Sequence, residues 1–101
     1  MYIYNVTLKV TWAIHDEWLQ WMIDKHMPEV MASGCFTGNQ LVKLLEQDEQ
    51  EGPTYAAQYY AACFEDYERY IEQFSQPLRE DGFKRWGNNF IAFRSIMQIV
   101  N

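Results

Sequence analysis

The sequence of 101 residues is long enough for one domain with its own core, and we expect residues 1–101 to form that domain. Its net charge of −6 argues against a nucleic-acid partner, because binding to phosphates requires a basic patch. No apolar run approaches the ~18 residues of a membrane span, and Met1–Val10 does not resemble a signal peptide, so we expect no membrane partner.

The first two expected elements are a strand and an amphipathic helix. Residues 2–11 alternate, with an apolar face that begins at Tyr2. Between residues 12 and 34, apolar side chains recur at steps of three and four, which is typical of a helix. We expect this helix to end near residues 25–27, Pro28 to begin one more turn and Gly34 to stop it.

The middle of the sequence predicts a hairpin and a second helix. Strands at residues 36–47 and 54–63 flank an acidic Gly-Pro turn. A helix at residues 55–67 is the alternative to the second strand, because alanine has a low strand propensity. Apolar steps of three and four from Phe64 onward predict the second helix, which Pro77 ends before a short turn to Gly82.

The alternating residues 90–100 predict the last strand, after an amphipathic or irregular segment at residues 83–86. The resulting order, β-α-β-β-α-β, indicates an α+β ferredoxin-like fold with a four-stranded antiparallel sheet and two helices on one face. Hydrophobic residues make up 49% of the chain and aromatic residues 17%, more than one covered face can bury. We therefore expect a homodimer formed through the open sheet face.

Four segments resemble a family of bacterial domains of unknown function. They are the opening MYIYNVT, then DEWLQWM, the more specific HMPEVMASGCF, and the phenylalanine-rich last strand. That family is similar to a branch of the dimeric α+β barrel superfamily, which includes cofactor-independent monooxygenases, lactone isomerases and haem enzymes. The resemblance covers essentially the whole chain and implies a dimeric α+β barrel. It implies no catalytic residue, because fold and activity vary independently in this superfamily.

The first candidate ligand site is a group of polar residues on one sheet face. A cavity that contains Lys9 and Arg94 would suit a small carboxylate or phenolate. The alternative is that these side chains form hydrogen bonds and ion pairs between subunits. The group consists of Lys9, Gln58, Arg94 and Gln98, together with Asn5, Thr7 and Tyr60.

The second candidate is an aromatic pocket between helix and sheet, with His26 at its mouth. Histidine titrates near neutral pH, so His26 would serve there as an acid or a base. The alternative is ordinary core packing with His26 at a helix end, since aromatic stripes at helical spacing usually form the core. The expected walls are Trp18, Trp21, Tyr59 and Trp86.

We expect neither a metal nor a cofactor. His15 and His26 are eleven residues apart, roughly 16 Å along a continuous helix, and cannot share one ion. Cys35 and Cys63 form no CxxC motif, and we interpret both as buried hydrophobic residues in a reducing, cytoplasmic compartment.

No catalytic motif is present, because a nucleophile elbow, a P-loop and a dinucleotide fingerprint are all missing from the sequence. Our first hypothesis is a homodimer that binds a small anionic or aromatic molecule or has a structural role. The alternative is a cofactor-independent monooxygenase or isomerase acting on a small aromatic or enolisable substrate, with His26 or Arg94 involved. The sequence leaves open whether the protein catalyses a reaction.

Overall fold

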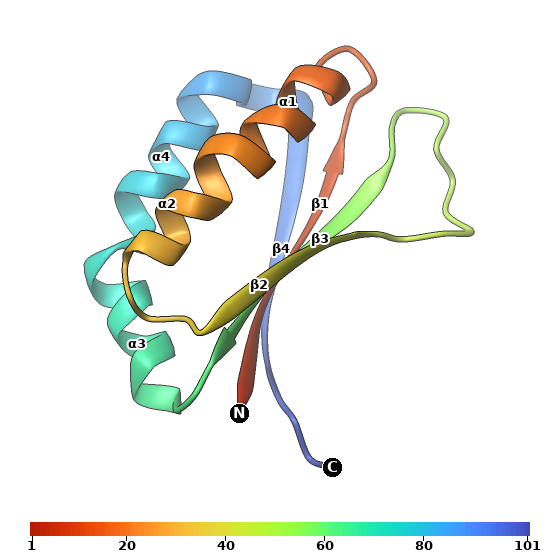
Figure 1. The fold of residues 1–101 in the computed structure, drawn as a ribbon. Helices are drawn as coiled ribbons and strands as arrows, with labels where there is room; N and C mark the ends of the chain where they lie inside the picture. The colour runs from red at the N-terminus through yellow and green to blue at the C-terminus, as the bar shows by residue number, and fades with distance from the viewer.

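The computed structural model describes all 101 residues and confirms the predicted order of strands and helices (Figure 1). Four antiparallel strands form one sheet in the order β2-β3-β1-β4. The strands are β1 (Tyr2–Val10), β2 (Gly38–Lys43), β3 (Thr54–Ala61) and β4 (Phe90–Gln98). The helices are α1 (His15–Trp21), the π-helix η1 (Met22–His26), α2 (Met27–Ala32), α3 (Phe64–Gln73), α4 (Ser75–Trp86) and the 3-10 turn η2 (Gly87–Asn89). This is the predicted ferredoxin-like α+β fold.

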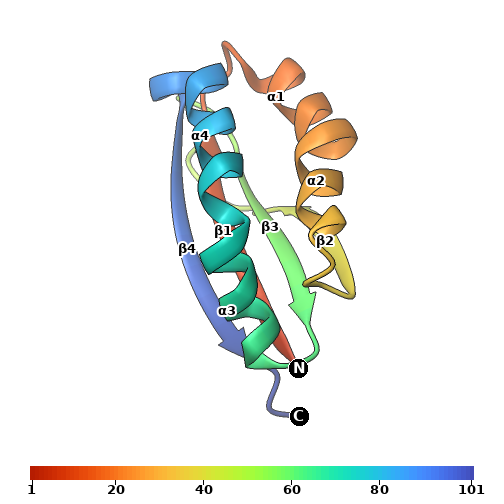
Figure 2. The same cartoon turned by 90° about the vertical axis from the view of Figure 1, so that its left-hand side faces the viewer.

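All the helices form one layer on a single face of the sheet (Figure 2). The core lies between the two layers, where Tyr4 and Tyr59 from the sheet meet Trp18 and Tyr70 from the helices. The opposite face carries no helix, and we call it the open face. No helix of this fold combines the length and the apolar character needed to cross a membrane.

Residues 54–61 form a strand, as predicted, and not the alternative helix. β3 pairs with β1 on one side and with β2 on the other, so its backbone is bonded along both edges. Its small residues Ala56 and Ala57 are buried in this central position. Pairing and burial therefore outweigh the low strand propensity of alanine.

The predicted boundary at residues 25–27 coincides with the change from η1 to α2, and Pro28 lies in the first turn of α2 as predicted, but the backbone stays helical across that boundary. His26 and Met27 keep helical backbone angles, and the N–H of Met27 donates to the carbonyl of Met22, five residues back. This wider π turn accommodates Pro28, whose ring clashes with the preceding turn of a regular α-helix. Gly34 stops the helical segment with a φ of +75°, as predicted.

The second helical segment is also longer than predicted. Pro77 lies in the first turn of α4, where a missing N–H is tolerated, and α4 runs on to Trp86. Its stop is Gly87, with a φ of +55°, and not Gly82. Gly82 is buried within α4, where an added Cβ would lie 3.5 Å from the Trp21 ring. This is an ordinary contact distance, so an alanine would also fit here beside Trp21.

The register of β4 contradicts the predicted grouping of Arg94 and Gln98 with Lys9 and Gln58. Arg94 pairs with Val6, so both side chains lie on the helix-covered face. Gln98 pairs with Tyr2 on that same face. The alternation in β4 did not reveal its orientation, because both of its faces carry large apolar side chains.

Candidate functional site: the pocket between helices and sheet

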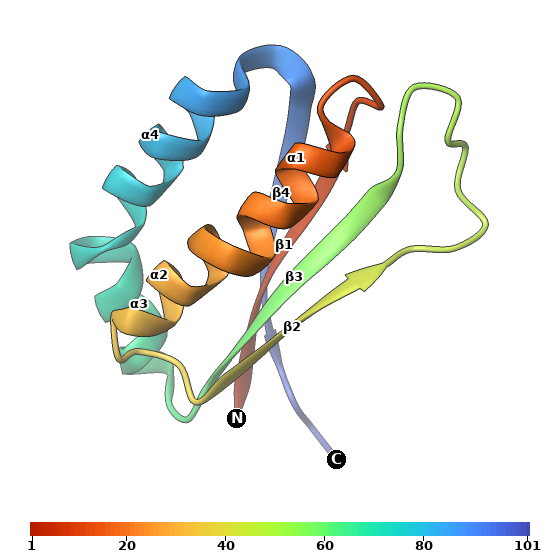
Figure 3. The same cartoon turned by 45° about the horizontal axis from the view of Figure 1, so that its top comes forward.

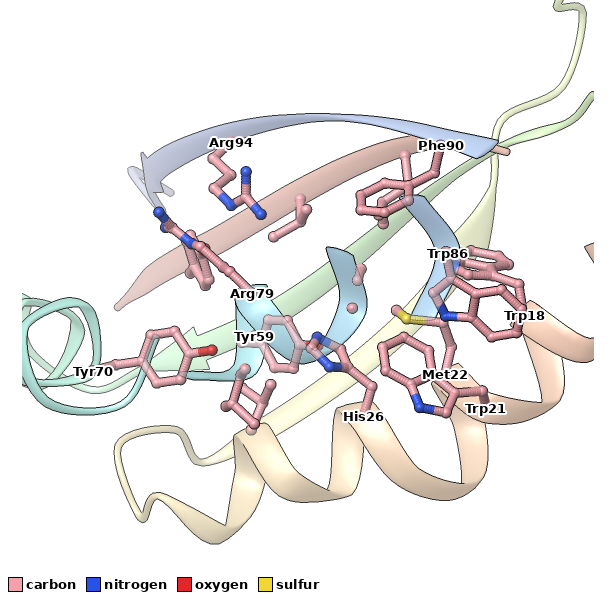
Figure 4. Close-up of a pocket in the computed structure, with 17 residues that line it drawn as sticks. Trp18, Trp21, Met22, His26, Tyr59, Tyr70, Arg79, Trp86, Phe90 and Arg94 are labelled. Atoms are coloured by element: carbon pink, nitrogen blue, oxygen red, sulfur yellow. The ribbon is translucent and has the colours of Figure 1, made fainter. Parts of the chain in front are cut away.

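A small cavity lies between the helical layer and the sheet (Figure 4). The space open to the centres of water-sized groups is about 50 Å³, whereas one water needs ~10–15 Å³ by that measure. Of its 17 lining residues, 13 are hydrophobic. β1, β3 and β4 form the floor, and the helices form the walls. A pocket that is mostly apolar with a few polar groups is typical of small-molecule sites.

His26 lies at the end of the π turn and lines the pocket. Its ring stacks on that of Trp21, with 4.8 Å between centroids. The buried Nδ1 atom has no hydrogen-bond partner. Burial lowers the pKa of His26, against the opposing effect of Glu29 and Asp81, so the imidazole is neutral at physiological pH. A neutral ring has one donor and one acceptor available for a ligand.

This burial predicts a pH dependence of stability. The unfolded chain takes up a proton near pH ~6.5 more readily than the folded protein does. His26 therefore has no effect on the free energy of unfolding well above that pH. It lowers the free energy of unfolding progressively as the pH falls toward the lower folded-state pKa. As the pH is lowered from about 7.5 to 5.5, we expect the urea concentration at the unfolding midpoint of the wild type to decrease. The midpoint of His26→Gln should decrease less. Identical pH slopes in both proteins would contradict the buried, neutral histidine.

Three buried polar atoms lack a hydrogen-bond partner, and all three belong to pocket residues. They are the Nδ1 of His26 and the indole Nε1 atoms of Trp21 and Trp86. Each unpaired buried group costs about 1–3 kcal/mol. A ligand with hydrogen-bonding groups would offset part of this cost, which distinguishes the pocket from an ordinary packed core.

Two arginines and two tyrosines occupy the other end of the pocket. Nη2 of Arg79 donates to the hydroxyl of Tyr4 at 3.2 Å. Figure 4 shows the guanidinium groups of Arg79 and Arg94 at the same end, with the hydroxyl of Tyr70 directed into the pocket. Burial raises the pKa of Tyr70, so its hydroxyl stays protonated and is able to donate. This end of the pocket is therefore rich in hydrogen-bond donors.

The structure divides the predicted site residues between the two faces of the sheet. His26, Trp21 and Arg94 line the pocket, together with the other three aromatic residues that the sequence suggested as walls. Sequence reasoning missed Arg79. Arg79 belongs to no motif in the sequence, and the three-residue and four-residue steps of the apolar side chains do not show that it lines a pocket.

Lys9, Gln58 and Tyr60 lie on the open face, away from the pocket. Gln58 is part of a row of hydrogen bonds in which Gln40 donates to Gln58 at 2.8 Å and Gln58 donates to Asn5 at 3.1 Å. Asn5 donates in turn to Thr7 at 3.0 Å. Lys9 donates to the carbonyl of Asp48 at 3.4 Å. These groups therefore bond to one another and to a loop, and they do not surround a cavity.

Residues 1–100 match the family model described as Domain of unknown function (DUF4286). The chain belongs to this family. The match confirms the predicted resemblance to a family of domains of unknown function over the whole chain. No curated protein matches this DUF4286 chain.

Solved structures with the same fold have very different sequences. An ethyl tert-butyl ether d (ethd) family protein from Bacillus halodurans C-125 has a TM-score of 0.70 at 12% identity, covering 99% of this chain and 100% of that one. A dimeric ferredoxin-like protein from an uncultured marine organism scores 0.63 at 13% identity, covering 100% and 96%. A variant of MhuD with two manganese protoporphyrin IX molecules bound per active site scores 0.60 at 14% identity, covering 98% and 95%.

These similarities confirm the fold of the DUF4286 chain. They do not show that it shares an activity with these proteins, because fold and function vary independently.

Proposed function

We propose that this DUF4286 protein is a homodimer that binds a small aromatic or anionic molecule in the pocket of each subunit. The observation that carries the proposal is the pocket itself, where unpaired buried polar atoms meet an otherwise aromatic lining. His26 would share a hydrogen bond with the ligand, and Trp21 and Trp86 would contact its ring. Two free cysteines support a reducing, cytoplasmic location.

The homodimer would form through the open face. β4 leaves large apolar side chains uncovered there, including Phe93, which is 68% exposed, and Ile91, which is 60% exposed. Large apolar side chains exposed together on one face usually mark an interaction surface. The dimeric ferredoxin-like protein from the marine organism shares this fold, which supports a second copy as the partner.

The test of the pocket uses the indole N–H signals of the four tryptophans in a proton–nitrogen NMR spectrum. We expect titration with benzamide, a neutral molecule with one ring, to shift the signals of Trp18, Trp21 and Trp86. Trp12 lies outside the pocket and is 49% exposed, so its signal is the internal control. Equal shifts for all four signals, or none at millimolar benzamide, would contradict the proposed site.

Gly82→Leu gives an independent check of the same site. Gly82 lines the pocket beside Trp21, so a leucine side chain would occupy the ligand's space. We expect this variant to lose the benzamide-induced shifts while it keeps a cooperative thermal transition. A folded Gly82→Leu protein that still binds benzamide at the same signals would place the ligand elsewhere.

A further inference from the structure

An open groove continues outward from the arginine end of the pocket, between α4 and β4. Arg79, Arg94 and Phe90 line both the pocket and the groove, so the two spaces are continuous. Lys84 and Glu80 also line the groove, on the solvent side. A ligand in the pocket therefore has a route to solvent that passes the two guanidinium groups.

The groove carries positive charge that the protein does not neutralise. Glu80 is its only carboxylate, beside three cations, Arg79, Lys84 and Arg94. None of these three forms an ion pair, whereas Lys25, Lys43 and Arg69 all pair with carboxylates. Arg94 has no side-chain hydrogen bond either, and the only partner of Arg79 is the hydroxyl of Tyr4.

This concentration of cations contrasts with the rest of the molecule. The chain has 14 acidic residues and only 8 Lys and Arg, yet three of those cations line one groove. Like charges at the same end of a pocket repel one another, and a bound anion relieves that repulsion. Guanidinium groups suit a carboxylate in particular, because their planar N–H groups match its two oxygens.

The size of the pocket limits the rest of the ligand. Its volume of about 50 Å³ for the centres of water-sized groups equals roughly three to five such groups at ~10–15 Å³ each. That space is smaller than the ~150 Å³ cavity that admits a benzene ring. One ring would therefore fill the pocket and extend into the adjoining groove, whose space by the same measure is about 480 Å³, whereas a fused ring system is too large for the pocket. Trp21, Trp86 and Tyr59 provide aromatic surface for the ring, within reach of His26.

Building on the proposed function, we propose that the ligand is an aromatic acid with one ring, whose carboxylate lies between Arg79 and Arg94. The ring occupies the pocket, and the groove between α4 and β4 is its entrance. Lys84 attracts the acid to this entrance. The ligand class follows from two residues that the sequence did not bring together, Arg79 from α4 and Arg94 from β4.

The experiment compares benzoate with its neutral analogue benzamide at neutral pH, with affinities taken from the indole N–H shifts. We expect wild-type protein to bind benzoate roughly 10-fold or more tightly than benzamide, as a charge-assisted hydrogen bond implies. Arg94→Gln and Arg79→Gln should each remove most of that preference, so that benzoate and benzamide bind these variants with similar affinities. The ends of both side chains lie at the exposed mouth, so these variants should fold.

Lys43→Gln is the matched control. It removes the same charge from β2, at the opposite edge of the sheet, and should keep the wild-type preference for benzoate. Equal affinities of benzoate and benzamide for the wild type would overturn the acid assignment but leave the pocket proposal standing. The acid assignment would also be overturned if Arg94→Gln and Arg79→Gln kept the preference for benzoate over benzamide. The same holds if Lys43→Gln lost this preference to the same extent as they do. Binding of neither molecule would overturn both proposals.

Discussion

Replacing Gly52 by alanine is expected to lower the free energy of unfolding by about 3 kcal/mol. Gly52 lies in the connection between β2 and β3, which extends past the ends of both strands (Figure 3). A Cβ at this position would overlap the carbonyl oxygen of Val10 and lie 2.7 Å from its carbonyl carbon. These are backbone atoms, so the clash is relieved only if the chain separates.

That separation would break hydrogen bonds on both sides of the glycine. The N–H of Val10 donates to the carbonyl of Pro53, and the N–H of Trp12 donates to that of Glu51, both at 3.1 Å. For a domain of this size, a loss of about 3 kcal/mol lowers the thermal midpoint by roughly 12–24 °C. Differential scanning calorimetry of wild type and Gly52→Ala measures this shift.

Gly82→Ala is the control for the glycine experiment. It makes the same chemical change within α4, where the added Cβ has ordinary contact distance to Trp21. Alanine favours a helix interior by ~0.8–1.0 kcal/mol over glycine, so this variant should be no less stable than wild type. A Gly52→Ala protein as stable as Gly82→Ala would show that the connection does not pack against the end of β1 as described.

Replacing Phe93 by aspartate is expected to convert the proposed homodimer into a monomer. Symmetry places the substitution on both sides of the interface, so each subunit loses ~1.5–3 kcal/mol of apolar burial. Together these losses weaken association by roughly 100-fold to 20,000-fold. Light scattering should give twice the 12.1 kDa chain mass for the wild type and the single chain mass for Phe93→Asp.

Phe83→Asp provides the matched control for this experiment. Phe83 is 63% exposed, close to the 68% of Phe93, but it lies on α4 at the other side of the sheet. The control should remain a dimer. A wild-type protein with the mass of one chain at micromolar concentration, or equal dissociation of both variants, would contradict dimerisation through the open face.

The fold was predictable because its signals are local. Alternation in β1 defined the helix-facing side chains, such as Tyr4 and Leu8, and the structure buries both. Gly34 was correctly placed as a stop, since a positive φ strongly favours glycine. The errors fell at the helix ends, because a π turn keeps the backbone helical up to Pro28 and α4, with Pro77 in its first turn, runs past Gly82 to Trp86.

The candidate site was only half predictable. Helical spacing was enough to suggest that Trp18, Trp21 and His26 lie near one pocket, and the structure places all three around it. The orientation of β4 was not accessible in the same way. Both of its faces are apolar apart from isolated polar residues, and a shift of one residue in register moves Arg94 from one side of the sheet to the other.

The sequence alone therefore determined the order of the elements, the sheet that they form and the excess of apolar surface, because periodicity and composition encode them directly. Tertiary structure alone decided that Arg79 of α4 and Arg94 of β4 lie at the same end of one pocket. It also decided that Lys9 lies on the opposite side of the sheet from them. The physical reason is that side-chain direction in a strand depends on pairing with a distant strand, which local patterns do not specify when both faces are apolar.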